Sequence, residues 1–136
     1  MDKTGFKKNS AAVTAALIAS VLLLASACIL PEIVIEKLCA RVGSELDIAI
    51  DNAISGDYAS AYSRAAFVNE SIERKADLLK LFFDHNEIYA LMAASKSAEE
   101  IAQTEDAAQL LEELNDVLKL LEGMRRMNDA SIYNLF

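Results

Sequence analysis

The sequence predicts an all-α protein, with an N-terminal transmembrane helix followed by a small antiparallel bundle of about four amphipathic helices. The chain of 136 residues has only four Gly and one Pro, is 54% hydrophobic and lacks Trp, a composition that favours helices over a turn-rich β fold. An uncharged run lies near the N-terminus, and helical periodicity follows it. We therefore divide the chain into a basic start (1–10), a transmembrane anchor or signal segment (11–30) and a helical domain (31–136).

Residues 11–30 form the predicted anchor. Its only hydroxyl side chains are those of Thr14, Ser20 and Ser26. At ~1.5 Å per residue, these twenty residues extend roughly 30 Å, the thickness of the bilayer hydrocarbon. The basic residues before it are Lys3, Lys7 and Lys8. Positive charge stays on the cytoplasmic side, so we expect a single-pass protein of the cell membrane, with a cytoplasmic N-terminus and an extracytoplasmic C-terminal domain.

The end of this run, Leu22–Leu30, has two other interpretations. The triplet Ala25-Ser26-Ala27 fits a signal peptidase site, and Leu24-Ala25-Ser26-Ala27-Cys28 fits a permissive lipobox whose Cys28 would be acylated. Ala25 stands where a lipobox more often has Leu, and the chain stays apolar through Ile35 where mature lipoproteins usually begin with a polar tether. An uncleaved anchor is favoured. A lipoprotein, a cleaved soluble form and a buried cytoplasmic helix remain open.

The helical domain is strongly acidic. The chain holds 13 basic and 21 acidic residues, and setting aside the start with its three Lys and Asp2 leaves 10 basic and 20 acidic, a net charge of -10. Such a domain repels phosphate backbones and anionic lipid surfaces, so we expect no nucleic-acid partner.

Four amphipathic helices are predicted after the anchor. The apolar stripe of the first comprises Ile35, Leu38, Val42, Leu46, Ala49 and Ala53. The break Ser55-Gly56-Asp57 ends it, with Gly56 in a left-handed conformation and Asp57 as the next cap. The stripe of the second helix comprises Tyr58, Tyr62, Ala65, Val68, Ile72, Ala76, Leu79 and Phe83. Short connections make antiparallel neighbours the default arrangement.

The third and fourth helices are predicted from their caps. Asp84 and Glu87 form a capping-box pattern ahead of an apolar stripe of Ile88, Leu91, Met92 and Ala98. Thr104 is the expected cap of the last helix, whose stripe is Leu110, Leu111, Leu114, Val117, Leu118 and Leu121. Gly123 suits its end, although Arg125 and Arg126 could extend it by a turn. We expect the tail to dock on the bundle through Ile132, Leu135 and Phe136.

The residues offer little reactive chemistry. Cys28 and Cys39 lie roughly 16 Å apart on a continuous helix, beyond disulfide reach, so Cys39 is expected to be a small buried residue or, alternatively, an intermolecular bridge in a parallel dimer. His85 is the only histidine, and helix-start geometry explains its acidic neighbours. The acidic pairs are Glu99-Glu100, Glu105-Asp106 and Glu112-Glu113. Adjacent helical residues point about 100° apart and do not converge on one ion. We predict no catalytic, cofactor or metal site, and no enzyme.

Several short segments together resemble one bacterial family. They are the start Gly56-Asp57-Tyr58, the segment from Phe83 to Ile88, the late Leu-rich helix and the closing Ser131 to Phe136, on a short chain with one N-terminal span. This combination looks like the bacterial family catalogued as domain of unknown function 4363. The resemblance implies a small membrane-anchored helical protein with no established reaction, and it transfers no functional residues.

The function expected from these features is protein contact. The chain would be a scaffold or interaction module that binds a membrane-protein partner or a second copy, besides the bilayer around residues 11–30. Ile33, Ile35 and the neighbouring stem residues are the predicted contact residues, because they lie beside the membrane and the apolar stripes exceed what one small core can hide. The alternative is an extracytoplasmic sensor that holds a small ligand or a cation between its helices, which would require a buried polar cluster or a cavity.

Overall fold

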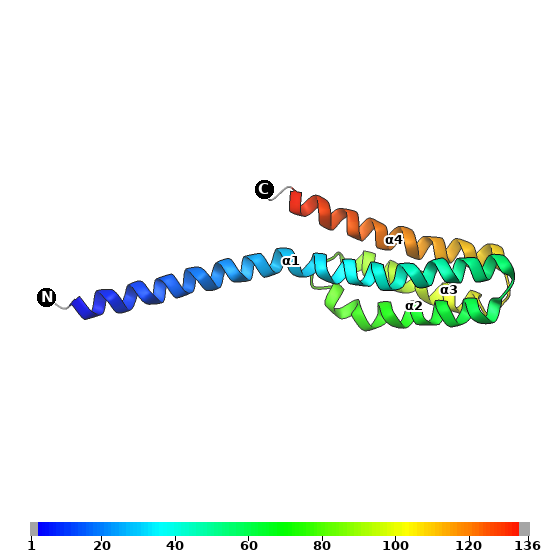
Figure 1. Cartoon of the computed structure of the whole chain (residues 1–136), viewed down its shortest axis with the longest axis horizontal. Coiled ribbons are helices and arrows are strands. Elements are labelled where there is room, and N and C mark those ends of the chain that lie inside the picture. Colours follow the sequence, from blue (N-terminus) through cyan, green and yellow to red (C-terminus); the bar gives the residue numbers. More distant parts are fainter. Residues whose placement is uncertain (1–2, 134–136) are drawn as a thin grey trace. The chain divides into compact units, whose positions relative to one another are not determined.

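The computed structural model describes the backbone of residues 3–133 and the side chains of residues 11–130. This part of the chain contains no strand and four helices, α1 (Lys3–Ser55), α2 (Tyr58–Leu79), α3 (His85–Ile101) and α4 (Ala107–Tyr133), shown in Figure 1. The predicted all-α fold is confirmed. The first predicted bundle helix is not a separate element, because the backbone is helical through Pro31 and joins it to the anchor.

The chain divides into two compact units, Met1–Leu30 and Pro31–Phe136. In the first, the side chains of residues 11–30 are almost all exposed; its large apolar members include Val13, Leu17, Val21, Leu22, Leu23 and Leu24, each at least 60% exposed. Among the described helices, one is long and apolar enough to cross a membrane, and its most apolar window, within Ala11–Ser55, has a mean hydropathy of 2.5 with none of it buried. A signal sequence would share these properties.

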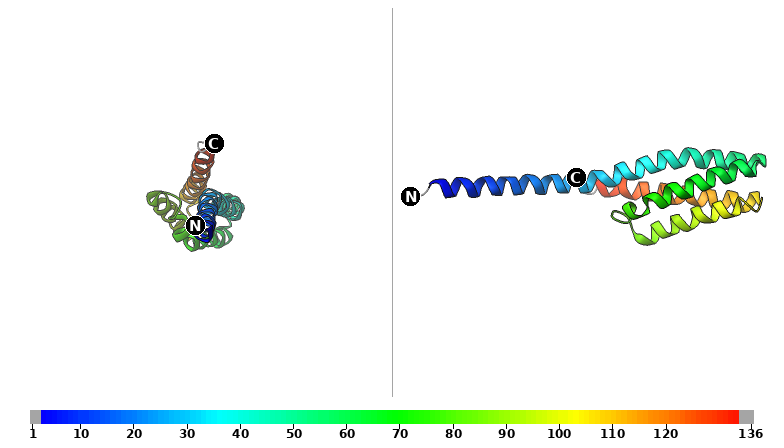
Figure 2. Two further views of the ribbon diagram at one scale, coloured as in Figure 1. Left: turned by 90° about the vertical axis from the view of Figure 1, so that its left-hand side faces the viewer. Right: turned by 90° about the horizontal axis from the view of Figure 1, so that it is seen from below.

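The second unit is a four-helix bundle. Residues 31–55 of α1 pack beside α2 and α4, α3 lies between α2 and α4, and successive helices run in opposite directions (Figure 2). Side-chain contacts tie the neighbours together: Glu45 to Arg64 between α1 and α2, and Cys39 to the Leu121 carbonyl between α1 and α4. Every residue of the stripe predicted for residues 35–53 is buried. Four antiparallel helices give each apolar stripe a partner, so they close around one core.

The core side chains change size along the bundle. Near the α1–α2 turn they are mostly alanine, namely Ala49, Ala53, Ala61, Ala65, Ala98 and Ala102. Toward the end where Pro31 lies they are larger, and they include Ile35, Ile72, Leu79, Ile88, Leu121 and Met124. Because alanine lets helix axes approach more closely than leucine does, we expect the helix axes to lie further apart at the Pro31 end.

The predicted turn between α1 and α2 is confirmed. Gly56 adopts the left-handed conformation, with φ of 80°. The Asp57 carboxylate accepts a hydrogen bond from the Ser60 backbone N–H at 3.1 Å and caps α2. Hydrogen bonding from Ser60 lowers the pKa of Asp57. Since a lowered carboxylate pKa stabilises the fold only while the group is ionised, this contribution is lost as the pH falls through the folded-state pKa.

Helix α2 ends earlier than its stripe predicted. It stops at Leu79, and Phe83 packs against the core from the following turn. Asp84 caps α3 as expected, accepting from the Asn86 N–H at 2.7 Å. The reciprocal Glu87 hydrogen bond of a capping box does not occur among the described residues.

Two predictions for the last helix are wrong. Thr104 does not cap it, because its hydroxyl donates back to the Ile101 carbonyl at 2.8 Å; Asp106 instead accepts from the Gln109 N–H at 3.1 Å. Nor does the helix end at Gly123. A glycine inside a helix costs only about 1 kcal/mol, and burial of Leu121 and Met124 on either side offsets it. The expected docking of Ile132, Leu135 and Phe136 lies outside the residues whose side chains are described.

A substitution in the α3–α4 turn should stabilise the protein. Glu105 is the one non-glycine residue with positive φ, 58°, in the described backbone. A side chain in this conformation costs roughly 1–2 kcal/mol, which glycine avoids at some entropic cost. We expect Glu105→Gly to raise the free energy of unfolding by about 0.5–1 kcal/mol, and Gly56→Ala, its matched counterpart, to lower it. Urea unfolding of the full chain in mild detergent measures both, and a Glu105→Gly variant less stable than the parent would contradict the expectation.

Candidate functional site

The main candidate site is a groove between α1 and α2, at the end of the bundle where Pro31 lies. Its volume is about 370 Å³. The apolar side chains along it are Ile33, Val34 and Leu38 from α1 and Phe67 from α2. The groove is open at the surface and partly apolar, which are properties of a contact or ligand surface. We call it the α1–α2 groove.

Antiparallel pairing sets the register of the two helices along the α1–α2 groove. Arg64 Nη1 lies 2.8 Å from Glu45 Oε2, and the Arg41 guanidinium lies 5.1 Å from the centre of the Phe67 ring. Because the two helices are antiparallel, each step of one residue toward the C-terminus of α1 is matched by a step of one residue toward the N-terminus of α2. This register brings Lys75 level with Ile33, at the Pro31 end of the α1–α2 groove.

The charged lining of the α1–α2 groove is basic. It comprises Lys37, Arg41, Arg74 and Lys75, with Glu70 as the single acid. Arg74 pairs with Glu70, and Arg41 stacks on Phe67. Lys37 and Lys75 are exposed and form no ion pair with any described residue. Four of the ten basic residues of a domain with net charge -10 thus line one groove.

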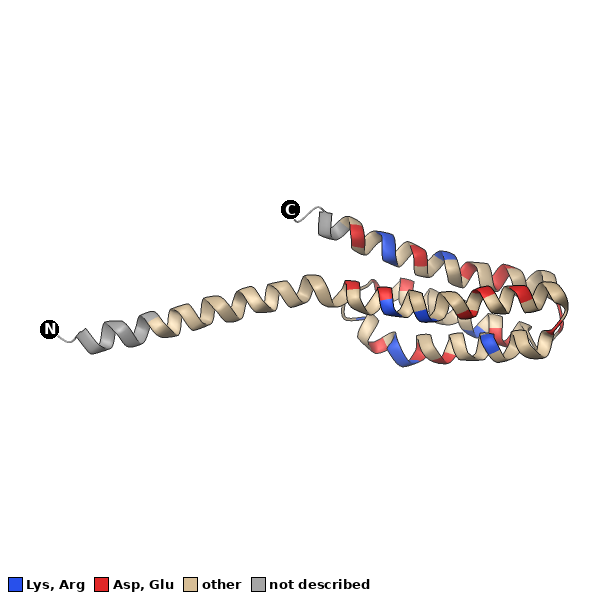
Figure 3. Ribbon diagram, viewed as in Figure 1, with Lys and Arg blue, Asp and Glu red and all other residues tan. Residues whose placement is uncertain are grey.

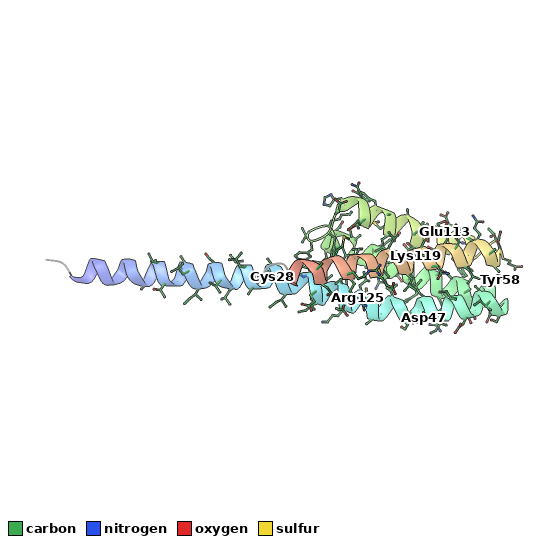
Figure 4. The ribbon with its side chains drawn as sticks, turned by 90° about the horizontal axis from the view of Figure 1, so that it is seen from above. Cys28, Asp47, Tyr58, Glu113, Lys119 and Arg125 are labelled. Atoms are coloured by element: carbon green, nitrogen blue, oxygen red, sulfur yellow. The ribbon has the colours of Figure 1, made fainter. Side chains whose placement is uncertain are left out.

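Charge is distributed differently at the other end of the bundle. Figure 3 shows acidic residues along the whole bundle, at the Pro31 end as well as around the α1–α2 turn, and the blue bands of α1 in the half of its bundle segment nearer Pro31. In Figure 4, Asp47, Tyr58 and Glu113 mark the end with the α1–α2 turn, and Arg125 lies toward the Pro31 end. The net charge of -10 therefore conceals a local basic surface. The repulsion of anionic surfaces expected from the net charge stays a prediction, and the α1–α2 groove is a local exception to the acidic composition behind it.

Only one of the two isoleucines predicted to make contacts is available at the surface. Ile33 is 43% exposed and lines the α1–α2 groove. Ile35 is fully buried in the bundle core, so its assignment as a contact residue is wrong. The reason is helical geometry: Ile35 lies on the same stripe as Leu38 and Val42, whereas a residue two positions away points about 200° around the axis.

A buried polar pair joins α2 to α3 and was not predicted. The Ser95 hydroxyl is fully buried and donates to Asn69 Oδ1 at 3.0 Å, with the Met92 carbonyl also 3.0 Å away. Asn69 Nδ2 donates to Glu99 Oε2 at 2.8 Å. The sequence does contain a sign of this pair, namely a polar residue on each of two apolar helix faces. Asn69 follows Val68 on the apolar face of α2, and Ser95 lies between Leu91 and Ala98 on the apolar face of α3.

The polar pair extends to the surface through charged groups. Lys96 Nζ lies 3.3 Å from Glu99 Oε2, and this hydrogen bond is the main cause of the raised Lys96 pKa. Buried polar atoms that bond one another hold two helices in a single register, since slippage would leave them unpaired. We assign the pair this structural role.

Removing the polar pair's amide should destabilise the bundle. Asn69→Ala removes the hydrogen bonds that tie Ser95 and Glu99 to α2, while the Ser95 hydroxyl can still donate to the Met92 carbonyl, so we expect the free energy of unfolding to fall by about 0.5–1.5 kcal/mol. Asn115→Ala is the matched control, because the Asn115 amide is exposed and bonds only the Leu111 carbonyl of its own helix. Denaturant unfolding of the full chain in mild detergent measures both losses. Equal losses of unfolding free energy for the two variants would show that the buried pair stabilises the bundle no more than an exposed hydrogen bond does.

The remaining reactive residues do not converge. His85 is exposed, with Nε2 3.2 Å from the Lys80 carbonyl. No group of three or more His, Cys, Asp or Glu side chains able to hold a metal ion occurs among the described residues. The acidic pairs 99–100, 105–106 and 112–113 lie at separate places on α3, the α3–α4 turn and α4.

Both cysteines are free thiols. Cys39 is half-buried against the core, with Sγ 3.9 Å from the Leu121 carbonyl. Burial, reinforced by the nearby Glu36 carboxylate, raises the pKa of the Cys39 thiol. A half-buried thiol with a raised pKa forms little thiolate, which favours the packing role over the intermolecular bridge.

No family model, curated protein or solved structure matches this chain. The resemblance to domain of unknown function 4363 therefore stays a prediction that rests on the segments quoted above.

Proposed function

We propose that this chain is a single-pass membrane protein whose helical domain lies outside the cytoplasm and acts by protein contact at the membrane surface, as a scaffold or modulator of a membrane partner. The observation that carries the proposal is the exposed apolar segment 11–30, which leads directly in sequence into a closed bundle. Twenty uncharged residues whose side chains nothing covers are stable only in hydrocarbon or against another protein.

The proposed contact surface is the α2–α3 turn. Leu81 is 73% exposed, and Leu78 and Tyr89 beside the turn are 37% and 56% exposed. This turn lies at the same end of the bundle as Pro31, the first residue after the span (Figure 1). Because Pro31 directly follows the proposed span in sequence, we favour an apolar helix of a neighbouring membrane protein as the partner over a free soluble protein.

Photocrosslinking in cells tests this surface. A photoreactive amino acid at position 81 of the full-length chain should yield a discrete protein adduct on illumination. The matched control is position 54, because Ile54 is 68% exposed but lies at the opposite end of the bundle. An adduct of twice the chain's mass would identify the partner as a second copy. Equal labelling at the two positions, or none at position 81, would exclude the turn as the contact surface.

Orientation needs a separate test. In a background with both Cys28→Ser and Cys39→Ser, Ile54→Cys should react with a membrane-impermeant maleimide in intact cells, because the proposal places the bundle outside the cytoplasm. Reaction only after the cells are lysed would reverse the proposed orientation.

The sensor alternative has a weaker basis. It requires a buried polar cluster or a cavity. In the described part of the core, the polar cluster is Asn69 with Ser95, whose polar atoms bond each other and their neighbours. The α1–α2 groove is open to the surface and is not enclosed between helices. The polar atoms of Asn69 and Ser95 already hydrogen-bond between α2 and α3, so we favour protein contact over ligand sensing.

A further inference from the structure

The α1–α2 groove combines features that the proposed function does not use. Its two unpaired ammonium groups, those of Lys37 and Lys75, lie among apolar side chains on a domain that is otherwise acidic. An occupant that matches this lining carries negative charge at one end and hydrocarbon at the other. A phospholipid with an anionic headgroup has this chemistry.

The position of the α1–α2 groove in the chain also fits such an occupant. Ile33 follows Leu30, the last residue of the proposed span, by three positions, and α1 is helical through both. At ~1.5 Å per residue, Ile33 comes roughly 5 Å and Lys37 roughly 10 Å after the span along the helix. The headgroup layer extends roughly 5–8 Å beyond the hydrocarbon, and a lysine side chain can reach toward it while its methylenes cover apolar surface.

Lys75 and Arg74 complete the basic lining from α2. The antiparallel register brings Lys75 level with Ile33. The part of the α1–α2 groove nearest Pro31 therefore holds cations from both helices. Arg74 already pairs with Glu70, and Arg41 with the Phe67 ring, which leaves Lys37 and Lys75 to meet an incoming anion. Two ammonium groups on facing helices can bind one phosphate from both sides.

We propose that the α1–α2 groove binds the phosphate headgroup of an anionic phospholipid from the membrane that holds residues 11–30. Lys37 and Lys75 contact the phosphate, while Ile33, Leu38 and Phe67 cover the glycerol and the first acyl carbons. The inference rests on the proposed membrane attachment, and it is independent of the protein contact at Leu81. A lipid is favoured over an acidic protein segment because an extended acidic segment would leave the groove and meet the acidic surface of the remaining bundle.

Native mass spectrometry of the full chain in mild detergent tests the proposal with phosphatidylglycerol and phosphatidylcholine as probes. We expect the parent chain to retain phosphatidylglycerol, and the variant Lys37→Gln with Lys75→Gln to retain it about tenfold less well or worse. The matched control is Lys119→Gln with Arg126→Gln, which removes the same charge from exposed positions on α4 and should retain phosphatidylglycerol within about twofold of the parent. Equal retention of both lipids, or an equal loss in both double variants, would overturn the proposal.

Amine acylation in vesicles gives a second readout on the unmodified chain. Lys37 and Lys75 should be protected in phosphatidylcholine vesicles that contain phosphatidylglycerol, relative to vesicles of phosphatidylcholine alone, while Lys119 reacts equally in both. Equal protection by inorganic phosphate would show a general anion site and overturn the lipid assignment. Protection in cell membranes without protection in phosphatidylglycerol vesicles would overturn it in favour of an acidic protein partner.

The vesicle experiment also separates this inference from the proposed function. If the chain does not sediment with either kind of vesicle, membrane attachment fails. If it sediments with both and Lys37 and Lys75 stay reactive, only the lipid site fails.

Discussion

A chain carrying Leu22→Arg together with Leu23→Arg is expected to leave the membrane fraction on alkaline carbonate extraction. Both leucines lie within the proposed span, and their side chains are 65% and 70% exposed. An arginine near the centre of a transmembrane helix costs about 2.5–3.5 kcal/mol, and each lost leucine forfeits about 0.5 kcal/mol more. Two such substitutions should therefore make insertion less favourable by roughly 6–8 kcal/mol.

The matched control places two arginines outside the span. Ile54→Arg with Ala59→Arg introduces the same charge at exposed positions beside the α1–α2 turn and should leave extraction unchanged. Continued resistance of the Leu22 and Leu23 variant would mean that residues 11–30 do not hold the chain by spanning the bilayer. Intact mass then distinguishes the cases, because an uncleaved anchor keeps the full 14.8 kDa, while a lipoprotein is shorter, acylated and lost in a Cys28→Ser variant.

Leu114→Ala should cost the bundle about 2–5 kcal/mol of unfolding free energy. Leu114 is fully buried, at the middle of the apolar stripe of α4. Its truncation removes hydrophobic burial and leaves a cavity that the surrounding helices only partly fill. A loss of this size is a large fraction of the 5–15 kcal/mol typical of a small domain.

Ile54→Ala provides the comparison for this prediction, because Ile54 is 68% exposed and its truncation should change stability by less than about 0.5 kcal/mol. Urea unfolding of the full chain in mild detergent, followed by circular dichroism, measures both variants. A Leu114→Ala chain as stable as the Ile54→Ala chain would mean that α4 does not pack in the bundle as described.

Much of the fold follows from local sequence patterns. The stripe from Ile35 to Ala53 and the caps Asp57 and Asp84 were predicted correctly, because helical periodicity and capping depend on residues a few positions apart. The last helix was predicted less well. Its cap and its end depend on competing local hydrogen bonds at Thr104 and Asp106, and on tertiary burial that carries the helix through Gly123.

The α1–α2 groove could not be predicted from the sequence for a different reason. Its lysines, Lys37 and Lys75, are 38 positions apart in the chain, and only the antiparallel register brings them to one surface. Net charge averages over the whole domain, so it gave no sign of a groove whose lining is mostly basic. Ile35 failed as a contact residue because proximity to the membrane in sequence says nothing about which side of a helix a residue occupies.

Pro31 also affects how easily the backbone before it unwinds. Proline has no N–H, so the Ala27 carbonyl, four residues earlier, lacks the donor that other interior residues of α1 supply. That carbonyl belongs to the Ala27–Cys28 peptide bond, the bond that either signal peptidase would cut. Peptidases act on extended chain, and local opening is easiest where a helical hydrogen bond is already absent. If a signal peptidase does recognise this segment, the missing hydrogen bond lowers the cost of unwinding the helix at the bond to be cut.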